Sequence, residues 1–315
     1  MTIDALRSLR RQVIPIALDI YDRLFPTSLL PALAQVVDNS QLQLTPYEVE
    51  WWNAFATLRR WIDEKSLQRI FTNNLSVSPE DWEITMAYDR TKVNESGVLV
   101  NPQEVAQTFA VGVLRGRLRN VLDVYRTNPV AYDGNALYDA DHAHFDDTPY
   151  SNVLPAGVDV AARADASAPT YQEAEAEMVA AKARLFLNVA FLEEAAEAAQ
   201  IDQNLIAIVR SDGVYSAFKG LLELERLEAG GPANRLKGTF RLVRDMKPGS
   251  ADPNSWDLVH AEPGGLRPAV QVLWKAFPNV EFEEPKFAKK LTPFGVEDKA
   301  GNKAAFPQVT VRTYN

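Results

Sequence analysis

Residues 132–142 of the chain read Tyr132-Asp133-Gly134-Asn135-Ala136-Leu137-Tyr138-Asp139-Ala140-Asp141-His142. Asp133-Gly134 predicts a tight turn, because glycine adopts the positive φ angles that such turns need. Asp141-His142 lies in a segment rich in potential metal ligands, because residues 139–147 contain two imidazoles and four carboxylates. The stretch therefore allows two interpretations, a structural turn or a metal site.

A long helix is predicted immediately before this stretch, over residues 102–128. Asn101 suits the N-cap and Pro102 suits the first helical position. Apolar residues recur along one face of this helix, and a narrow basic stripe lies beside them. The stripe consists of Arg115, Arg119 and Arg126. We expect salt bridges within or between chains for these arginines, with direct phosphate contact as the alternative.

Upstream, residues 1–24 carry apolar side chains at helical spacing, interrupted by Pro15. This pattern predicts an amphipathic helix that Pro15 kinks or divides. Periodicity does not say whether its apolar stripe packs within the chain or on a neighbouring chain. A cluster of aromatic residues follows, for which packing in a core is the preferred interpretation. The cluster consists of Tyr47, Trp51, Trp52, Phe55 and Trp61.

Residues 67–88 predict a long β-hairpin. Leu67–Thr72 and Trp82–Tyr88 have strand-like patterns, and turn-forming residues separate them. Strands of this length project about 24 to 30 Å, which is too far for one small domain to cover their tip. We therefore expect the tip to contact a neighbouring chain. The tip consists of Val77, Ser78, Pro79, Glu80 and Asp81.

The remaining sequence mixes helices and strands without a repeat or regular βαβ alternation. Residues 169–200 predict a helix with a break at Asn188, and residues 214–227 predict a second helix. Short strands are predicted at Leu205–Val209, Phe240–Val243, Trp256–His260, Val280–Glu283 and Val309–Arg312. The fold class predicted from these elements is α+β.

Charge is distributed unevenly along the chain. The formal net charge is -9 at pH 7, with 33 Lys and Arg against 42 Asp and Glu. Residues 131–204 alone contain 14 acidic and three basic residues, so the rest of the chain is slightly basic. This balance argues against tight binding of nucleic acid over the whole surface. For most of these acids a solvated helix face is the preferred interpretation.

The residue types limit the possible chemistry. The chain has no cysteine, which excludes disulfides, thiolate metal sites and a thiol nucleophile and fits a reducing compartment. No export signal or membrane span is recognisable, so no membrane partner is expected. The motifs of serine hydrolases and of phosphate-binding loops are absent from the sequence. A metal-dependent hydrolase using Asp139, Asp141, His142 and His144 stays open as an alternative.

Several segments resemble the Mu-like phage major head subunit family. Residues 132–142 resemble the family's signature, and Tyr150–Leu154 resembles its Tyr-Ser-Asn-Leu step. Leu58–Trp61 resembles the family's Leu-Arg-Glu-Trp, and Asn234–Gly238 resembles its Asn-Pro-Leu-Lys-Gly. These similarities occur in order between about residues 44 and 285. The sequence departs from the family's pattern at Ala143, at Asn94-Glu95 and in the C-terminal tail.

The resemblance implies the Hong Kong 97-type capsid fold and a division into five parts. Residues 1–53 would form an N-terminal arm, and residues 54–100 an extended hairpin loop region. Residues 101–200 would form a peripheral domain containing the spine helix 102–128, and residues 201–263 an axial domain. Residues 264–315 would return to the peripheral domain and end in the C-terminal tail. In this interpretation Tyr132, Asp133, Gly134, Asp141 and His142 form a structural turn and perform no chemistry.

The function implied by the resemblance is the major capsid protein of a tailed double-stranded DNA bacteriophage. It would be a structural protein without enzymatic activity or cofactor, part of the virion capsid and assembled in the bacterial host cytoplasm. Its main partner would be itself, in the hexamers and pentamers of an icosahedral shell. Portal, scaffold and decoration proteins would be further partners, and packaged DNA would be bound only weakly and non-specifically. An encapsulin-like nanocompartment shell is the alternative within the same fold.

Overall fold

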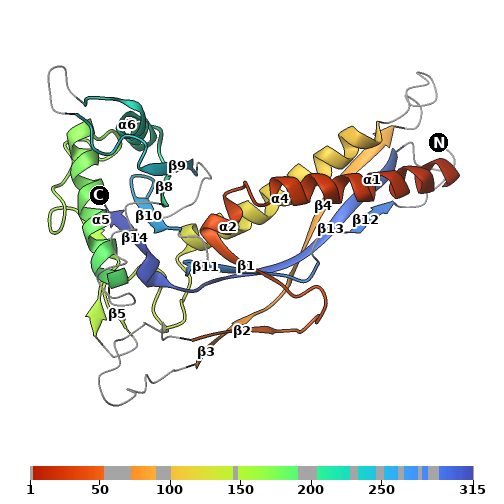
Figure 1. Cartoon of the computed structure of the whole chain (residues 1–315), viewed down its shortest axis with the longest axis horizontal. Coiled ribbons are helices and arrows are strands. Elements are labelled where there is room, and N and C mark those ends of the chain that lie inside the picture. The colour runs from red at the N-terminus through yellow and green to blue at the C-terminus, as the bar shows by residue number, and fades with distance from the viewer. Residues whose placement is uncertain are drawn as a thin grey trace, which may run out of the picture. The chain divides into compact units, whose positions relative to one another are not determined.

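The computed structural model describes residues 3–52, 72–89, 101–144, 148–190, 204–227, 233–245, 252–261, 266–275, 279–282 and 291–314. Contacts divide the chain, shown in Figure 1, into two compact units. Unit 1 contains residues 1–47, 76–121 and 270–302, and unit 2 contains residues 48–75, 122–269 and 303–315. Each unit is therefore assembled from segments that lie far apart in the sequence.

Unit 1 is built on a five-stranded sheet. Four of its strands are neighbours in the order β1-β11-β13-β12, and the fifth strand, β4, also pairs with β13. The β4–β13 pairing is antiparallel over ten residue pairs, from Leu291 opposite Asp89 to Ala300 opposite Glu80. The strands in order are β1 (Ala34–Asp38), β11 (Ala269–Leu273), β13 (Leu291–Ala304) and β12 (Asn279–Phe282), with β4 at Glu80–Asp89. A short helix, α2 (Leu30–Leu33), precedes β1.

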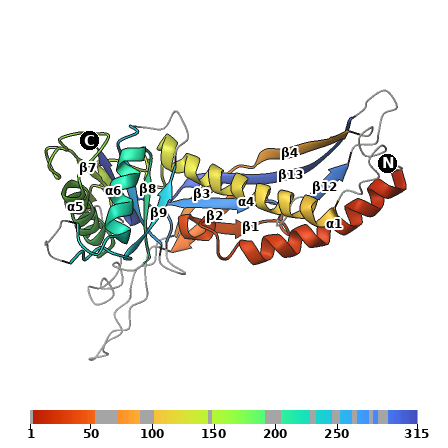
Figure 2. The same cartoon turned by 90° about the horizontal axis from the view of Figure 1, so that it is seen from above.

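Two helices form the core of unit 1 with this sheet. α1 (Ile3–Leu24) lies beside α4 (Pro102–Thr127), as Figures 1 and 2 both show. The buried cluster between them contains Leu9, Val13, Ala17 and Tyr21 from α1 and Val105, Ala106, Phe109, Ala110 and Val113 from α4. The apolar stripe of residues 1–24 is thus covered by the same chain. Pro15 is exposed inside α1 and does not divide it.

The ends of α4 follow from its flanking residues. Asn101 caps the N-terminus, since its Oδ1 accepts from the backbone N–H of Gln103 at 3.0 Å. At the other end Asn128 takes a φ of 50°, a left-handed conformation that stops helices. The predicted helix of residues 102–128 is therefore confirmed, with Thr127 as its last residue.

Unit 2 contains a second five-stranded sheet, in the order β7-β14-β10-β8-β9. β10 pairs antiparallel with both β8 and β14, while β8–β9 and β14–β7 are parallel. Every residue of β8 and of β10 is buried. The strands are β7 (Val153–Pro155), β8 (Leu205–Val209), β9 (Phe240–Arg244), β10 (Trp256–His260) and β14 (Thr310–Tyr314), the last preceded by the 3-10 helix η2 (Pro307–Val309).

Two helices accompany this sheet, α5 (Tyr171–Ala190) and α6 (Asp212–Glu223). Phe218 of α6 packs on Trp256 of β10, with ring centroids 4.5 Å apart. The predicted break at Asn188 is wrong, because α5 continues to Ala190. The side chain of Asn188 is buried and donates to the carbonyl of Ser151 at 3.0 Å, so tertiary contact satisfies it inside a helix.

The predicted hairpin at residues 67–88 is not formed by the part of it that the structure describes, residues 72–88, and its first strand lies outside the described residues before Thr72. β3 (Thr72–Val77) pairs with β2 (Tyr47–Trp52) in a two-stranded sheet, and β4 pairs with β13. Five of the residues expected in a turn, 73–77, therefore belong to a strand. The prediction failed because the partner of β4 lies about two hundred residues away, and pairing at that distance leaves no local pattern.

The β2–β3 ribbon changes the interpretation of the aromatic cluster. Tyr47, Trp51 and Trp52 belong to β2, so these residues are part of the ribbon. Phe55 and Trp61 lie outside the described residues, as does the start of the predicted strand before Thr72. Residues 53–71, which connect the two strands of the ribbon, also lie outside the described residues.

Candidate functional site: the turn after α4 and the ionic cluster beside it

The segment after α4 is fixed by hydrogen bonds to its own backbone. Asn128 Oδ1 accepts from the N–H of Tyr138 at 2.7 Å, and its amide donates to the Tyr138 carbonyl at 3.2 Å. Between these residues Val130 and Ala136 form a β-bridge. Gly134 takes a φ of 86°, the left-handed region that the predicted turn requires. Residues 128–138 therefore form a closed loop.

His142 attaches the rest of the predicted motif to this loop. Its Nδ1 lies 2.5 Å from Asp133 Oδ2, and the imidazole is buried. The rings of His142 and His144 both stack on Tyr150, with centroids 5.1 and 4.2 Å away. Because its imidazole contacts Asp133 and Tyr150, His142 is part of the packing of unit 2.

Asp141 and Tyr132 complete the motif. Asp141 is exposed, and its N–H donates to Asp139 Oδ1 at 3.0 Å. Tyr132 is partly buried against Phe306, and burial raises the pKa of its hydroxyl above the ordinary value, with Asp133 adding to the effect. All five residues predicted for the turn thus occur in one loop of unit 2.

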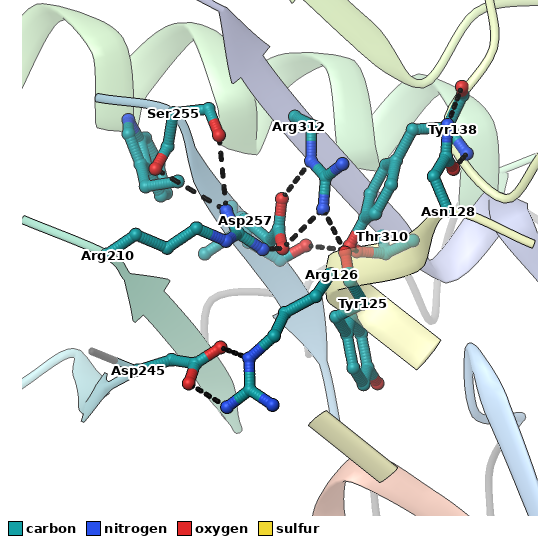
Figure 3. Close-up of polar contacts among 12 residues, drawn as sticks. Tyr125, Arg126, Asn128, Tyr138, Arg210, Asp245, Ser255, Asp257, Thr310 and Arg312 are labelled. Atoms are coloured by element: carbon teal, nitrogen blue, oxygen red, sulfur yellow. Dashed lines mark hydrogen bonds and ion pairs between the residues drawn. The ribbon is translucent and has the colours of Figure 1, made fainter. Parts of the chain in front are cut away.

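A buried aspartate joins three strands beside this loop, as Figure 3 shows. Asp257 of β10 accepts from Nε and Nη2 of Arg312 in β14 at 2.6 and 3.0 Å. It also binds Arg210, which follows β8. The guanidinium of Arg312 lies 3.7 Å from the centre of the Tyr138 ring and donates to the carbonyl of Tyr125. This Asp257 cluster therefore connects α4, the turn, β8, β10 and the C-terminal strand.

The charges of the Asp257 cluster are strongly coupled. The side chains of Asp257, Arg210 and Arg312 have no solvent exposure in their ion pairs. Burial raises the pKa of the Asp257 carboxyl, but the two guanidiniums outweigh it and hold the pKa below its ordinary value. The aspartate is thus charged at neutral pH, and loss of its charge would leave two buried cations.

A second buried ion pair ties α5 to the same sheet. Arg163 donates from Nε and Nη2 to Glu177 at 2.6 and 2.7 Å, and the indole N–H of Trp256 donates to Glu177 Oε2 at 2.8 Å. The sequence pattern does not identify Glu177, because it favours a solvated helix face for most acids of residues 131–204. The available signal was its spacing from Ala174, Met178 and Ala181, which lie on the buried side of α5.

Residues 26–166 match the family described as Mu-like prophage major head subunit gpT. This segment includes the ribbon, α4 and the turn described above. Over these residues, a little under half of the chain, the sequence is similar to the major head subunits of Mu-like prophages. The chain is a major head protein of a tailed phage, a component of the virion capsid that assembles into an icosahedral shell, and not an enzyme. No curated protein sequence matches the chain.

Solved capsid structures have the same fold at very low sequence identity. The capsid protein of Cyanophage P-SCSP1u is 10% identical, with a TM-score of 0.52 over 89% of this chain and 86% of that one. The mature capsid protein of bacteriophage PhiM1 is 11% identical, with a TM-score of 0.50 over 91% of this chain and 86% of that one. The α+β fold of this head subunit is therefore the Hong Kong 97 type.

The basic stripe of the head subunit does not act as one group. Arg126 is buried and pairs with Asp245 and with Asp123 in unit 2. Arg115 and Arg119 are exposed in unit 1. The salt bridge expected for the stripe therefore occurs at Arg126, within the chain, while the other two arginines face solvent.

The site shows no arrangement for metal chemistry among the described residues. No group of three or more His, Cys, Asp or Glu side chains within those ranges could hold a metal ion. Asp146 and Asp147 lie outside them. Within the same ranges, no helix is long and apolar enough to cross a membrane. His142 and His144 of the head subunit stack on Tyr150, and His142 also contacts Asp133, so both are part of its packing.

His260 gives the head subunit a predicted dependence on pH. Burial, with a smaller effect of Arg267, lowers the pKa of His260 to about 4. In the unfolded chain the pKa of histidine is about 6.5. Between about pH 6.5 and pH 4, His260 therefore binds a proton in the unfolded state but stays neutral in the folded state. We expect the free energy of unfolding to fall as pH drops from about 6.5 to about 4, with His260 contributing roughly 2 kcal/mol of the loss at pH 5.

Chemical unfolding of dissociated subunits at pH 7 and pH 5 measures this effect. His260→Gln removes the titrating group, and the difference in stability between the two pH values should shrink by that amount. The variant's lower or higher stability at pH 7 does not matter for this comparison. An unchanged difference would show that His260 does not titrate in this range.

Proposed function

We propose that the head subunit forms the hexamers and pentamers of an icosahedral shell that encloses a double-stranded DNA genome. The observation that carries this proposal is the family match over residues 26–166, which includes the ribbon, the long helix and the turn. A shell is stable even when single contacts are weak, because each further contact in a closed lattice is effectively intramolecular.

The β2–β3 ribbon is proposed as the extended loop that reaches a neighbouring subunit. A two-stranded sheet is marginally stable by itself in water and gains stability from a surface that covers it. Val49 and Leu75 bury their side chains in the ribbon, and the segment between its strands, residues 53–71, is 19 residues long. The contact role predicted for Val77–Asp81 stays a prediction, since these residues connect β3 to β4 and β4 pairs within unit 1.

The five-part division of the chain is proposed on the same grounds. Residues 201–263, the predicted axial domain, all belong to unit 2 and contain β8, α6, β9 and β10. Most of the predicted arm, residues 1–53, belongs to unit 1. Contacts around the capsomer axis would then be made by unit 2, and contacts of the arm and the ribbon would connect neighbouring subunits.

The remaining partners are proposed from charge and from the demands of assembly. With a net charge of -9, the subunit has no overall attraction for the packaged DNA, which supports weak and non-specific contact. A phage head also needs a portal and a scaffold, and some heads carry a decoration protein. These proteins are therefore proposed as further partners.

The test of this function replaces residues 53–71, which connect β2 to β3, by a flexible Gly-Ser linker of about six residues. We expect folded subunits, because the described core of each unit is untouched, but particle yield at least about tenfold lower, since the lost contact repeats at every subunit. Circular dichroism measures the fold, and sedimentation with electron microscopy measures the particles. A linker of equal length replacing residues 246–251 is the matched control.

Each outcome of this test has a clear meaning. Full particle yield from the ribbon variant would show that the ribbon does not hold subunits together. If the unaltered protein gave only a 35 kDa species in light scattering, the assembly function itself would be wrong. Particles with cargo enzymes and no DNA would favour an encapsulin-like shell.

A further inference from the structure

Unit 1 has an open groove beside α4, on the side of β4. The cavity measures about 560 Å³ and is bounded by α4, β4 and β13. Its walls are partly apolar, with Trp82 and Ile84 contributed by β4. Trp82 remains 39% exposed, which is unusual for so large an apolar side chain. The groove is therefore an uncovered surface that can take a further side chain or segment.

Two glycines four residues apart, Gly112 and Gly116, line the groove. Contacts within the described part of the chain explain the lack of a side chain at only one of them. A Cβ on Gly112 would lie 2.9 Å from Ile84 Cδ1, so the packing of β4 accounts for that glycine. A Cβ on Gly116 would meet no atom within 4 Å. Because glycine weakens a helix interior relative to alanine, the position of Gly116 points to close approach by a partner.

The groove is also cationic. Arg115 and Arg119 line it, both exposed and without an ion pair among the described residues. Arg117 is neutralised, since it donates to both carboxylate oxygens of Asp298 at 2.7 Å. Glu83 is the one other charged residue lining the groove. The groove therefore carries a net positive charge of one.

We propose that this groove receives an acidic segment of unit 2 from a second copy of the chain. The argument is charge complementarity, since residues 131–204 of unit 2 carry 14 acidic residues against three basic ones. Exposed members of this set include Asp141 and Asp165. An approaching carboxylate would pair with Arg115 and Arg119, while the missing side chain at Gly116 leaves room for the backbone that carries it.

This proposal rests on the proposed function, assembly of the subunit into a shell. The test is designed so that failure of this proposal and failure of the assembly function give different results. Gly116→Leu fills the groove, and Arg115→Gln with Arg119→Gln removes its charge. We expect both variants to fold, because Gly116 has open space and both arginines are exposed, but to give particle yields at least about tenfold lower. The controls are Gly116→Ala and the double variant Arg11→Gln with Arg235→Gln, which removes the same charge from exposed sites outside the groove.

Cross-linking identifies the occupant directly. The chain has no cysteine, so Gly116→Cys can carry a single thiol-linked photoreactive probe. Particles are assembled from equal parts of labelled and isotopically heavy subunits. We expect cross-links from position 116 to residues 131–204 of the other isotopic form, identified by mass spectrometry.

The alternatives give different results. Cross-links within one chain only would show that a segment of the same subunit fills the groove, and would overturn the proposal. Normal particle yield of the Arg115/Arg119 variant with reduced DNA retention would overturn it in favour of phosphate binding. Failure of the unaltered protein to assemble would instead contradict the proposed function, and normal yield of both groove variants would contradict this inference alone.

Discussion

Replacing Asp257 by asparagine should lower the free energy of unfolding of unit 2 by about 3 to 5 kcal/mol. The substitution removes the one buried carboxylate that Arg210 and Arg312 share. Asparagine keeps the size of the side chain but supplies neither the charge nor the second acceptor oxygen. Two guanidiniums would then be buried without a counter-ion, which is far more costly than losing an exposed ion pair.

The measurement is chemical unfolding of dissociated subunits, together with particle yield by sedimentation. Because typical stabilities are only about 5 to 15 kcal/mol, the variant should form few or no particles. Asp159→Asn is the matched control, since its ion pair with Arg184 is partly exposed and its loss should cost under about 1 kcal/mol. If the two substitutions lowered the free energy of unfolding equally, the buried Asp257 cluster would contribute no more to stability than a partly exposed ion pair.

Removal of residues 310–315 should abolish the fold of unit 2. β14 lies between β7 and β10 in the sheet, so the truncation leaves both neighbours without a partner on that side. It also removes Arg312 and with it the bond to the Tyr125 carbonyl at the end of α4. Because unpaired buried backbone groups each cost about 1 to 3 kcal/mol, the combined loss exceeds the stability of a domain of this size.

Near-ultraviolet circular dichroism and limited proteolysis of the truncated chain measure this loss. Thr313→Val is the control, because it keeps the strand and removes only a long hydrogen bond of 3.4 Å to the Trp256 carbonyl. We expect the control to assemble normally. Native-like particles from the truncated chain would show that β14 is dispensable and that Asp257 is neutralised in another way.

Local signals predicted the helices and the buried strands well. Asn101 and Pro102 marked the start of α4, and the helical period carried it to Thr127. Trp256–His260 was predicted with its final bounds. These elements succeed because caps and apolar periodicity act between residues that are close in the sequence. The same holds for Gly134, whose positive φ follows from the turn that Asp133-Gly134 predicts.

Non-local pairing explains the predictions that failed. The sequence around Pro79 looks like a hairpin, but β4 pairs with β13, whose residues 291–304 come much later in the chain. Asn188 looks like a helix break, but a buried carbonyl accepts its hydrogen bond. In both cases a distant partner supplies more stabilisation than the local preference that it overrides.

By itself the sequence determined the α+β class, the long helix, the turn and the similarity to phage head subunits. The tertiary structure alone decided which charges are buried, because Arg115, Arg119 and Arg126 have the same chemistry and helical spacing, and only Arg126 meets a buried aspartate, Asp245. It also decided that the stripe on α1 is covered by α4 of the same chain. Periodicity fixes which face of a helix is apolar, whereas the covering surface depends on contacts between segments far apart in the sequence.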